Sequence, residues 1–352
     1  MDILHSDLLL LIFDLLPDYS RHICRSVCRR WRNTLPNVNL FPGDFAISNK
    51  LLKWALDRKA PKAHICNAAA KNGYLGVLKF AEKNLCPWNR KTCQKAAEGN
   101  QLHVLKWLRK QGCSWDEETA AKAAFHGHLS LLKWIVENNG LTGIYTCYEA
   151  ARGGQLEVLK WLRQRNYSWD ECVCSSAALG GHLELIKWAR SEGCPWSVGT
   201  CSEAAAGGHI DIIKWARSEG CPWDEYTCAK AAGSGHLSIL QWARSEGAPW
   251  DDWTCIFAAF GGHLEILQWA RANGAPWDVS VCSFAAKKGH LHIIKWARSE
   301  GCPWDKYTCY DAANKGHLDV LKWAKQNLAP WDKEICLKDA KNQEIRDYIL
   351  AT

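Results

Sequence analysis

Cysteine and histidine are the residues in this sequence that could bind a metal ion or take part in nucleophilic catalysis. The chain of 352 residues contains 18 cysteines and 13 histidines. Seven of the histidines fall at one point of a 27-residue period: His128, His182, His209, His236, His263, His290 and His317. Gln101 and Gln155 occupy the same point elsewhere. A zinc site needs four converging ligands, so this repetition predicts a hydrogen bond in each turn and no metal site.

The cysteines follow the same period. Ten of them share one position, and Ala120 fills the gap in the series: Cys66, Cys93, Cys147, Cys174, Cys201, Cys228, Cys255, Cys282, Cys309 and Cys336. Equivalent atoms of stacked helical repeats lie roughly 8–10 Å apart, whereas a disulfide tolerates Cα atoms only roughly 4.4–6.8 Å apart. We therefore expect reduced, buried thiols that pack as small apolar side chains, as in a cytoplasmic or nuclear protein.

An enzyme would need a nucleophile beside a uniquely placed base. Here Cys and His recur at equivalent positions of many units, so no single asymmetric pocket is expected, and no glycine motif of the phosphate-binding kind is present. Cys24 and Cys28 lie four residues apart on an expected helix, but no second Cys or His pair stands nearby. We expect no catalytic residue, no metal and no cofactor.

Tryptophan marks the repeat most clearly. One series has a 27-residue spacing and extends back to Phe80: Trp107, Trp134, Trp161, Trp188, Trp215, Trp242, Trp269, Trp296 and Trp323. A second series has the same spacing, with a gap at Thr142: Trp88, Trp115, Trp169, Trp196, Trp223, Trp250, Trp277, Trp304 and Trp331. Such regularity predicts a stacked array, with ten units over residues 65–334 and a C-terminal cap over 335–352.

Each unit is expected to fold as helix, turn, helix and tight loop. In the unit 200–226, Asp224 can cap the next helix, and Gly220 followed by Pro222 forms a helix stop signal. Ile212, Ile213 and neighbouring apolar residues form a stripe at helical spacing. The sequence therefore predicts an all-α solenoid.

This unit resembles the ankyrin repeat. Its TC-x-x-AA segment stands where ankyrins have TPLHxAA, GHLEIL at 262–267 matches the start of their second helix, and GCPWD at 220–224 replaces GADVN. The unit is shorter than the 33-residue ankyrin repeat, which removes most of the hairpin finger. By this resemblance Trp215 and Trp223 take core positions, and we expect them to pack in the core; base stacking in a nucleic-acid-binding solenoid is the alternative.

Residues 1–40 have a different pattern, and 41–64 are expected to be a linker and N-terminal cap. DLLLLIFDLLP, a spacer and ICRSVCRRWR resemble the two helices of an F-box, with His5 where that family usually has Pro. The resemblance implies contacts with the Skp-type adaptor of cullin-RING ubiquitin ligases by Leu8, Leu9, Ile12, Phe13, Leu16, Val27, Cys28 and Trp31. The alternative is an amphipathic cap for the solenoid.

A target surface is expected where the units differ from one another, at the start of their first helices. These positions carry aromatic residues with lysines beside them: Tyr145, Tyr148, Tyr226, Lys230, Trp253, Phe257, Phe284, Lys287, Lys288, Tyr307 and Tyr310. Ankyrin-like arrays use this face, and Tyr and Trp are frequent interface anchors. Scattered surface aromatics without a partner remain the alternative for any one of them.

Charge and hydropathy exclude several classes of protein. Residues 1–64 hold 10 basic and 6 acidic side chains, so the totals of 44 and 37 leave 34 and 31 for the rest. Such a nearly neutral array is not expected to bind nucleic acid. No stretch is long and apolar enough for a membrane span, and the run 8–13 lacks the basic start of a signal peptide.

An F-box joined to a repeat array is the arrangement of a substrate receptor. We therefore expect a non-enzymatic subunit of an SCF-type ubiquitin ligase that holds a protein target on its repeats. The rivals are an ankyrin-type scaffold or decoy without a ligase and, third, a nucleic-acid-binding solenoid. Because such combinations are abundant in large DNA viruses, host cytoplasm is the expected location if the source is viral.

Overall fold

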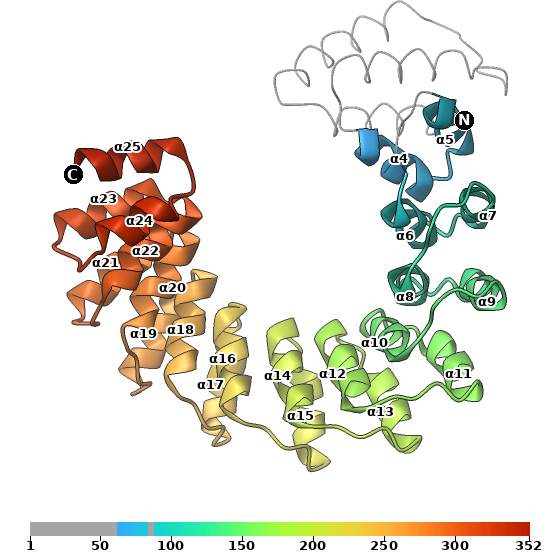
Figure 1. Ribbon diagram of the computed structural model, residues 1–352. Helices are drawn as coiled ribbons and strands as arrows, with labels where there is room; N and C mark the ends of the chain where they lie inside the picture. Colours follow the sequence, from blue (N-terminus) through green and yellow to red (C-terminus); the bar gives the residue numbers. More distant parts are fainter. Residues whose placement is uncertain (1–61, 84–87) are drawn as a thin grey trace, which may run out of the picture. The chain divides into compact units, whose positions relative to one another are not determined.

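The computed structural model describes residues 62–83 and 88–352, which form 22 helices and no strands. Two compact units are present, the first ending at Ser168 and the second running from Trp169 to Thr352. Each unit is a stack of helix pairs with two layers, one of first helices and one of second helices (Figure 1). The predicted all-α solenoid of helix-turn-helix repeats is confirmed.

The first unit contains four helix pairs. Its first helices are α4 (Lys62–Lys71), α6 (Arg90–Glu98), α8 (Glu117–Phe125) and α10 (Ile144–Arg152). Its second helices are α5 (Leu75–Lys83), α7 (Leu102–Lys110), α9 (Leu129–Glu137) and α11 (Leu156–Gln164).

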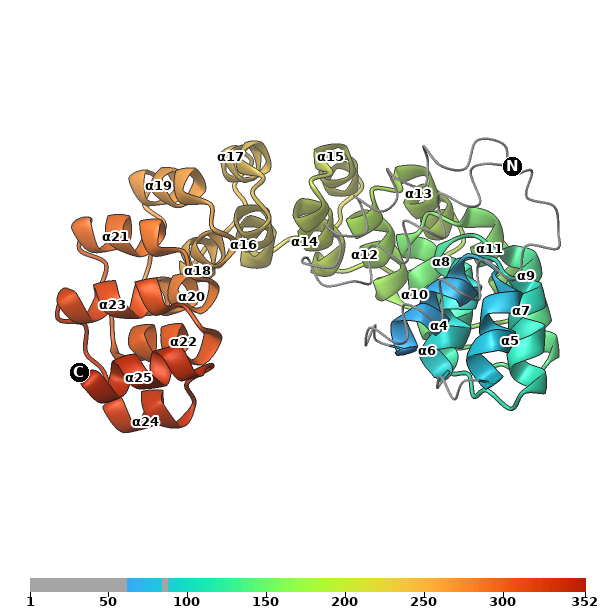
Figure 2. The ribbon, with the colours of Figure 1, turned by 90° about the horizontal axis from the view of Figure 1, so that it is seen from above.

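The second unit contains six further pairs, whose two layers are visible from above in Figure 2. Its first helices are α12 (Glu171–Gly180), α14 (Val198–Gly207), α16 (Glu225–Gly233), α18 (Asp252–Gly261), α20 (Ser280–Lys288) and α22 (Lys306–Lys315). Its second helices are α13 (Leu183–Ser191), α15 (Ile210–Ser218), α17 (Leu237–Ser245), α19 (Leu264–Ala272), α21 (Leu291–Ser299) and α23 (Leu318–Gln326).

Short polar signals set the ends of these helices. Asp224 accepts a hydrogen bond from the backbone N–H of Tyr226 at 3.1 Å, which confirms it as the N-cap of α16. Gly220 follows α15 with φ +81°, a left-handed conformation that glycine adopts without strain. Leu328 holds the same place after α23 with φ +62° and is 89% exposed. A leucine side chain is unfavourable in that conformation.

The first helices pack closely against one another because their contact faces are small. Ala204, Ala205 and Cys201 of α14 are fully buried, and α14 packs on both α12 and α16. Helix ends come closest at glycine: a Cβ at Gly153 would lie 1.9 Å from the carbonyl oxygen of Phe125 in the preceding repeat. A side chain at position 153 would therefore force these helices apart.

The second helices contribute the larger core side chains. Ile212, Ile213 and Ala216 of α15 are fully buried. Ile210 and Trp215, which belong to the same predicted stripe, are only half-buried. The core of each repeat is therefore an aliphatic layer on the second helix packed against alanine and cysteine on the first.

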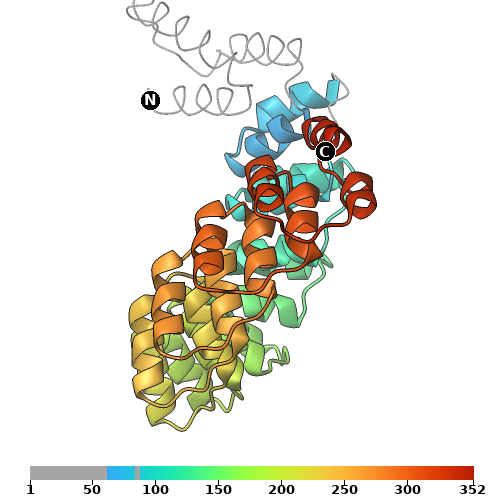
Figure 3. The same ribbon diagram turned by 90° about the vertical axis from the view of Figure 1, so that its left-hand side faces the viewer.

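Two short helices, α24 (Lys333–Lys338) and α25 (Gln343–Ala351), follow the last repeat and end at the C-terminus (Figure 3). Ile345 and Ile349 are fully buried, and the backbone N–H of Lys341 donates to the carbonyl of Ala313 at 3.0 Å. These contacts cover the end of α22. The proposed boundaries of the domains, 1–40, 41–64, 65–334 and 335–352, stay predictions.

Among the residues that the structure describes, no helix has the length and apolar character needed to cross a membrane.

Candidate target-binding surface

Every residue predicted to bind a target lies on a first helix. Tyr145 and Tyr148 lie on α10 in the first unit, and the others lie on α16, α18, α20 and α22 in the second. The exposed aromatic residues of the set are Tyr145 (37%), Tyr226 (44%), Trp253 (36%) and Tyr307 (54%), and Lys288 is exposed as well. The variable positions are therefore on the surface, although the structure does not test whether they bind a partner.

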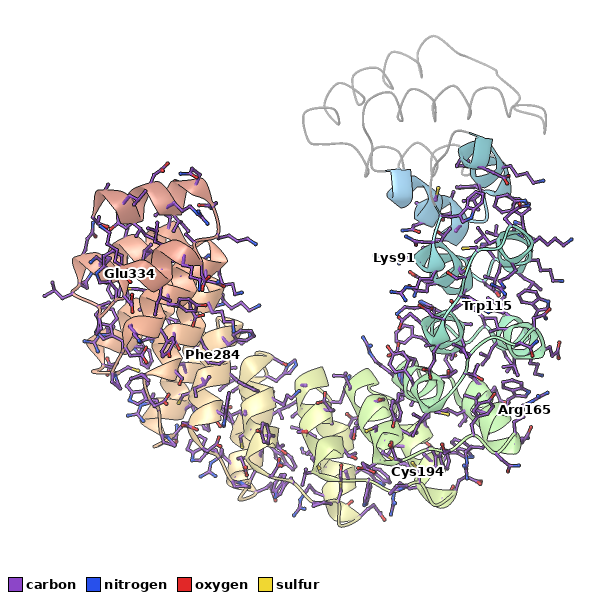
Figure 4. All side chains as sticks on the ribbon, viewed as in Figure 1. Lys91, Trp115, Arg165, Cys194, Phe284 and Glu334 are labelled. Atoms are coloured by element: carbon purple, nitrogen blue, oxygen red, sulfur yellow. The ribbon has the colours of Figure 1, made fainter. Side chains whose placement is uncertain are left out.

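Four aromatic rings of α18 and α20 meet in one group, here called the aromatic cluster: Trp253, Phe257, Phe260 and Phe284. Trp253 makes edge-to-face contacts with Phe257, at a centroid distance of 5.4 Å, and with Phe284, at 6.2 Å. Phe260 contacts Phe284 at 5.9 Å, and Figure 4 labels Phe284 on its helix. The cluster is a continuous apolar surface shared by two adjacent repeats.

Sequence reasoning missed Phe260. It lies three residues after Phe257 on α18, so helical spacing places both on one face. Its counterparts in neighbouring repeats are Gly233 and Lys287, which makes it one of the variable positions. A search for variation along the whole first helix, instead of at its start, would have found it.

Two lysines border the aromatic cluster. The ammonium of Lys288 lies 4.5 Å from the centre of the Phe260 ring, and that of Lys287 lies 5.5 Å from the Phe284 ring. The positive charge of Lys287 also acts on Asp311 of α22. Burial raises the pKa of the Asp311 carboxyl, and the charges of Lys287 and Lys315 lower it in part. The cluster thus combines apolar area with positive charge, a surface that suits a partner with apolar and acidic side chains.

Three of the remaining predicted residues, Tyr145, Lys230 and Tyr310, already interact with other groups of the protein. Lys230 pairs with Glu203 of the preceding repeat at 3.0 Å. The Tyr310 hydroxyl donates to Asp339 at 3.2 Å, which raises the pKa of Tyr310. Tyr145 has a raised pKa, first because of burial, with neighbouring Glu149 adding to the effect. These residues help to hold the array together, so the aromatic cluster is the better candidate for a docking surface.

The tryptophans are not fully buried, and the expectation of core packing is wrong in that respect. Trp107, Trp215, Trp223 and their described equivalents are half-buried. Each loop tryptophan from Trp88 to Trp304 lies edge-to-face against the second-helix tryptophan of the following repeat, as Trp223 does with Trp242 at 6.0 Å and 62°. Eight such pairs are present in the described residues, with centroid distances from 5.1 to 6.0 Å. We call this series the tryptophan ladder.

Basic side chains cover the tryptophan ladder. Arg217 lies 4.4 Å from the ring of Trp223 and donates to the carbonyl of Cys221, while Lys214 lies 5.5 Å from the ring of Trp242. Trp115, in the loop between α7 and α8, has Arg109 above it at 4.3 Å (Figure 4). Because intramolecular cations occupy these ring faces, the geometry gives no support to stacking on nucleic-acid bases.

Two turn histidines, His128 and His290, form hydrogen bonds with the backbone of the preceding repeat. His128 Nε2 lies 3.1 Å from the carbonyl oxygen of Glu98 in the preceding repeat, which confirms the predicted hydrogen bond at this residue. Gln155 makes the equivalent bond to Phe125 at 3.1 Å. No group of three or more metal-binding side chains occurs in residues 62–83 and 88–352.

The predicted adaptor-binding residues, from Leu8 to Trp31, lie outside the residues that the structure describes. Comparison with known families does include them, since residues 1–42 match the model of the F-box domain. Residues 255–298, which contain most of the aromatic cluster, match a model described as ankyrin repeats (many copies). The chain combines an F-box with ankyrin repeats. F-box and ankyrin-repeat families are typically non-catalytic adaptor and interaction domains.

Other comparisons add little. No curated protein matches the chain. Among solved structures, the ankyrin repeat domain of human ASB11 is similar, with 17% sequence identity and a TM-score of 0.39. The similarity covers 51% of this chain and 96% of that one. Two segments of the chain thus match family models, residues 1–42 the F-box domain and residues 255–298 ankyrin repeats.

Proposed function

We propose that this F-box protein is a substrate-recruiting subunit of an SCF-type, cullin-RING ubiquitin ligase. The observation that supports the proposal is the presence of an F-box match at residues 1–42 in the same chain as a ten-pair helical array. F-box domains typically bind the Skp-type adaptor, and ankyrin repeats typically bind proteins. One end of the chain would thus bind the ligase and the other the target.

The adaptor contact is assigned to the apolar residues of the F-box segment. Leu8, Ile12 and Leu16 recur at intervals of four, so on a helix they share one face. In the second expected helix, Val27 and Cys28 lie four and three residues before Trp31, so both can neighbour it on one face. Such short amphipathic helices have too small an interior to bury these side chains alone, and they therefore need a partner surface.

The target contact is assigned to the aromatic cluster. Trp253 is 36% exposed, and three phenylalanines extend the apolar area across α18 and α20. Lys287 and Lys288 add positive charge at its border. Aromatic side chains in this arrangement are typical of the residues that dominate binding energy in protein interfaces.

Adaptor binding is tested with the full chain and a purified Skp-type adaptor. Wild type is expected to co-elute with the adaptor in size-exclusion chromatography, and Leu8→Asp/Ile12→Asp is expected to abolish co-elution while far-UV circular dichroism stays unchanged. Trp253→Ala/Phe284→Ala is the matched control and should bind the adaptor as wild type does. A folded wild type that fails to bind would exclude the ligase role and favour the scaffold or decoy alternative.

Location and nucleic-acid binding are tested separately. We propose that the protein acts in the cytoplasm or nucleus, which for a viral protein would be the host cytoplasm; imaging of the tagged chain in cells tests this. The nucleic-acid alternative predicts binding that weakens steeply with salt, with Lys and Arg contacts to phosphates as the cause. We expect no such binding in a fluorescence-anisotropy titration at low salt.

A further inference from the structure

Four of the described repeats contain a second cysteine, which lies in the loop after the second helix. It follows the first-helix cysteine by 20 residues, giving the pairs Cys93 and Cys113, Cys174 and Cys194, Cys201 and Cys221, and Cys282 and Cys302. Three other repeats keep the first-helix cysteine but have alanine in the loop: Ala248, Ala275 and Ala329. The chain therefore contains both the thiol pair and its natural alanine counterpart.

The two sulfur atoms of a pair are in contact. Cys93 Sγ lies 3.3 Å from Cys113 Sγ, with both side chains buried. The S–S bond of a disulfide is roughly 2.05 Å long, so the two sulfur atoms would have to approach each other by about 1.2 Å to form one. This contact joins two cysteines of one repeat. Equivalent cysteines of stacked repeats are different, because their Cα atoms are too far apart for a disulfide. The 27-residue period relates cysteines of different repeats and so does not reveal a contact within one repeat.

The other three pairs have the same arrangement. Their thiols are also hydrogen bonded to each other. In all four pairs the loop thiol contacts the carbonyl oxygen of a residue just before the first helix, at 3.4 to 3.5 Å: Cys113 with Asn89, Cys194 with Asp170, Cys221 with Ser197 and Cys302 with Asp278. The fold thus holds each loop thiol at the start of its own repeat's first helix.

Hydrogen bonding favours ionisation of three loop thiols, whereas the hydrogen bond with Cys282 raises the pKa of the fourth, Cys302. The hydrogen bond from Cys93 lowers the pKa of Cys113 more than burial raises it, and the Arg109 guanidinium lowers it further. Cys194 and Cys221 have lowered pKa values for the same reasons. A thiolate is the form of cysteine that reacts with oxidants. Cys194 is labelled in Figure 4, in the loop that follows α13.

We propose that these four thiol pairs are oxidation sites, each of which closes to a disulfide within one repeat when the protein meets a peroxide. The loop thiolate attacks the peroxide, which takes up a proton and leaves water and a sulfenic acid on the loop cysteine. The first-helix thiol then attacks that sulfur and gives up its proton, forming the S–S bond and releasing a second water. Two thiols and one peroxide thus give one disulfide and two waters.

Oxidation would close each repeat on itself without joining it to its neighbours. Each new bond ties the loop after the second helix to the first helix of the same repeat. The loop closed this way is 20 residues in sequence, which is long enough for a disulfide to restrict the unfolded chain appreciably. We expect the repeats with a thiol pair to become more stable than those with alanine, because neighbouring repeats are otherwise built alike.

The test uses the full chain, reduced, desalted and treated with hydrogen peroxide under native conditions. The protein is then denatured in N-ethylmaleimide and digested, and its peptides are mapped by mass spectrometry without reduction. For the four described pairs we expect four linked peptides, each joining cysteines 20 residues apart and each lighter by two hydrogens; Cys66 and Cys86 are a fifth pair with this spacing in the sequence. Cys228, Cys255 and Cys309 should carry the maleimide. Complete alkylation of all four pairs, or links mainly between different repeats, would overturn the proposal.

Two variants serve as matched controls. Cys194→Ala should remove the link to Cys174 and leave the other three, because position 194 then matches the natural alanine repeats. Ala248→Cys should add a new link, to Cys228. In wild type the apparent melting temperature should rise by at least about 4 °C on oxidation and return on reduction. No rise despite complete linkage would refute the stabilising role of the disulfides.

Discussion

Removing the two rings of one rung of the tryptophan ladder should reveal a direct coupling between successive repeats. Trp223 lies in the loop before α16, and Trp242 lies on α17 of the repeat that follows. Their rings meet edge-to-face at 6.0 Å and 62°. Arg217 and Lys214 of the preceding second helix lie over the two rings. A double-mutant cycle with Trp223→Ala and Trp242→Ala measures the coupling energy between these two side chains.

The expected magnitude follows from these contacts. An edge-to-face pair contributes about 1 kcal/mol beyond the burial of its rings. The coupling energy of Trp223 and Trp242 should therefore be about 1 kcal/mol. For Trp242→Ala alone we expect a loss of about 2–3 kcal/mol, below the roughly 3–5 kcal/mol of a fully buried aromatic residue, because the ring is half-buried.

Urea unfolding followed by far-UV circular dichroism measures this coupling, since tryptophan fluorescence would change with the substitutions themselves. Trp223→Ala/Trp269→Ala is the control pair, because Trp269 contacts Trp250 instead. Its two effects should add to within about 0.5 kcal/mol. Additivity in the Trp223 and Trp242 cycle, or equal coupling in the control, would refute the idea that the ladder couples adjacent repeats.

Three further substitutions test other features of the array. Leu328→Gly should raise the free energy of unfolding by about 1 kcal/mol in urea titration, because it relieves a left-handed leucine whose side chain is 89% exposed; a loss would argue against strain there. Thr254→Val should be neutral or stabilise by about 1 kcal/mol, because the buried Thr254 hydroxyl has no hydrogen-bond partner among the described residues; clear destabilisation would reveal a missing partner. Burial raises the pKa of Glu98, but ion pairs with Lys71 and Lys95 outweigh it and lower the pKa to about 2. The stability from these ion pairs is present above the usual pKa of 4.5 and is lost as pH falls toward 2. After allowance for solvent screening we expect a loss of about 1–2 kcal/mol, absent in Glu98→Gln; equal acid sensitivity of both proteins would contradict it.

The repeat architecture could be predicted because its signals are local. Asp224 and Gly220 mark helix ends through their own backbone and side-chain chemistry, and the structure confirms both. A period of 27 residues over most of the chain requires stacking, whatever the details of the packing. The sequence therefore carried enough information for the helix pairs and their order.

Burial and side-chain partners were harder to predict because they depend on contacts between repeats. The regular recurrence of Trp215 indicated an important role but not how deeply the ring is buried, since an indole can pack at the rim of a core. Lys230 looked available in sequence, yet it pairs with Glu203 of the preceding repeat. The contact of Cys93 with Cys113 depends on how one helix pair folds back on itself, which no periodic pattern encodes.

The tryptophan ladder also has an optical consequence. Indole rings this close, with planes 62° to 74° apart, share their electronic excitations, so each rung absorbs polarised light as a coupled pair. Every rung spans the boundary between two repeats. The resulting signal in circular dichroism would report on those boundaries separately from the helices, and the intact array therefore carries its own label for the docking of one repeat on the next.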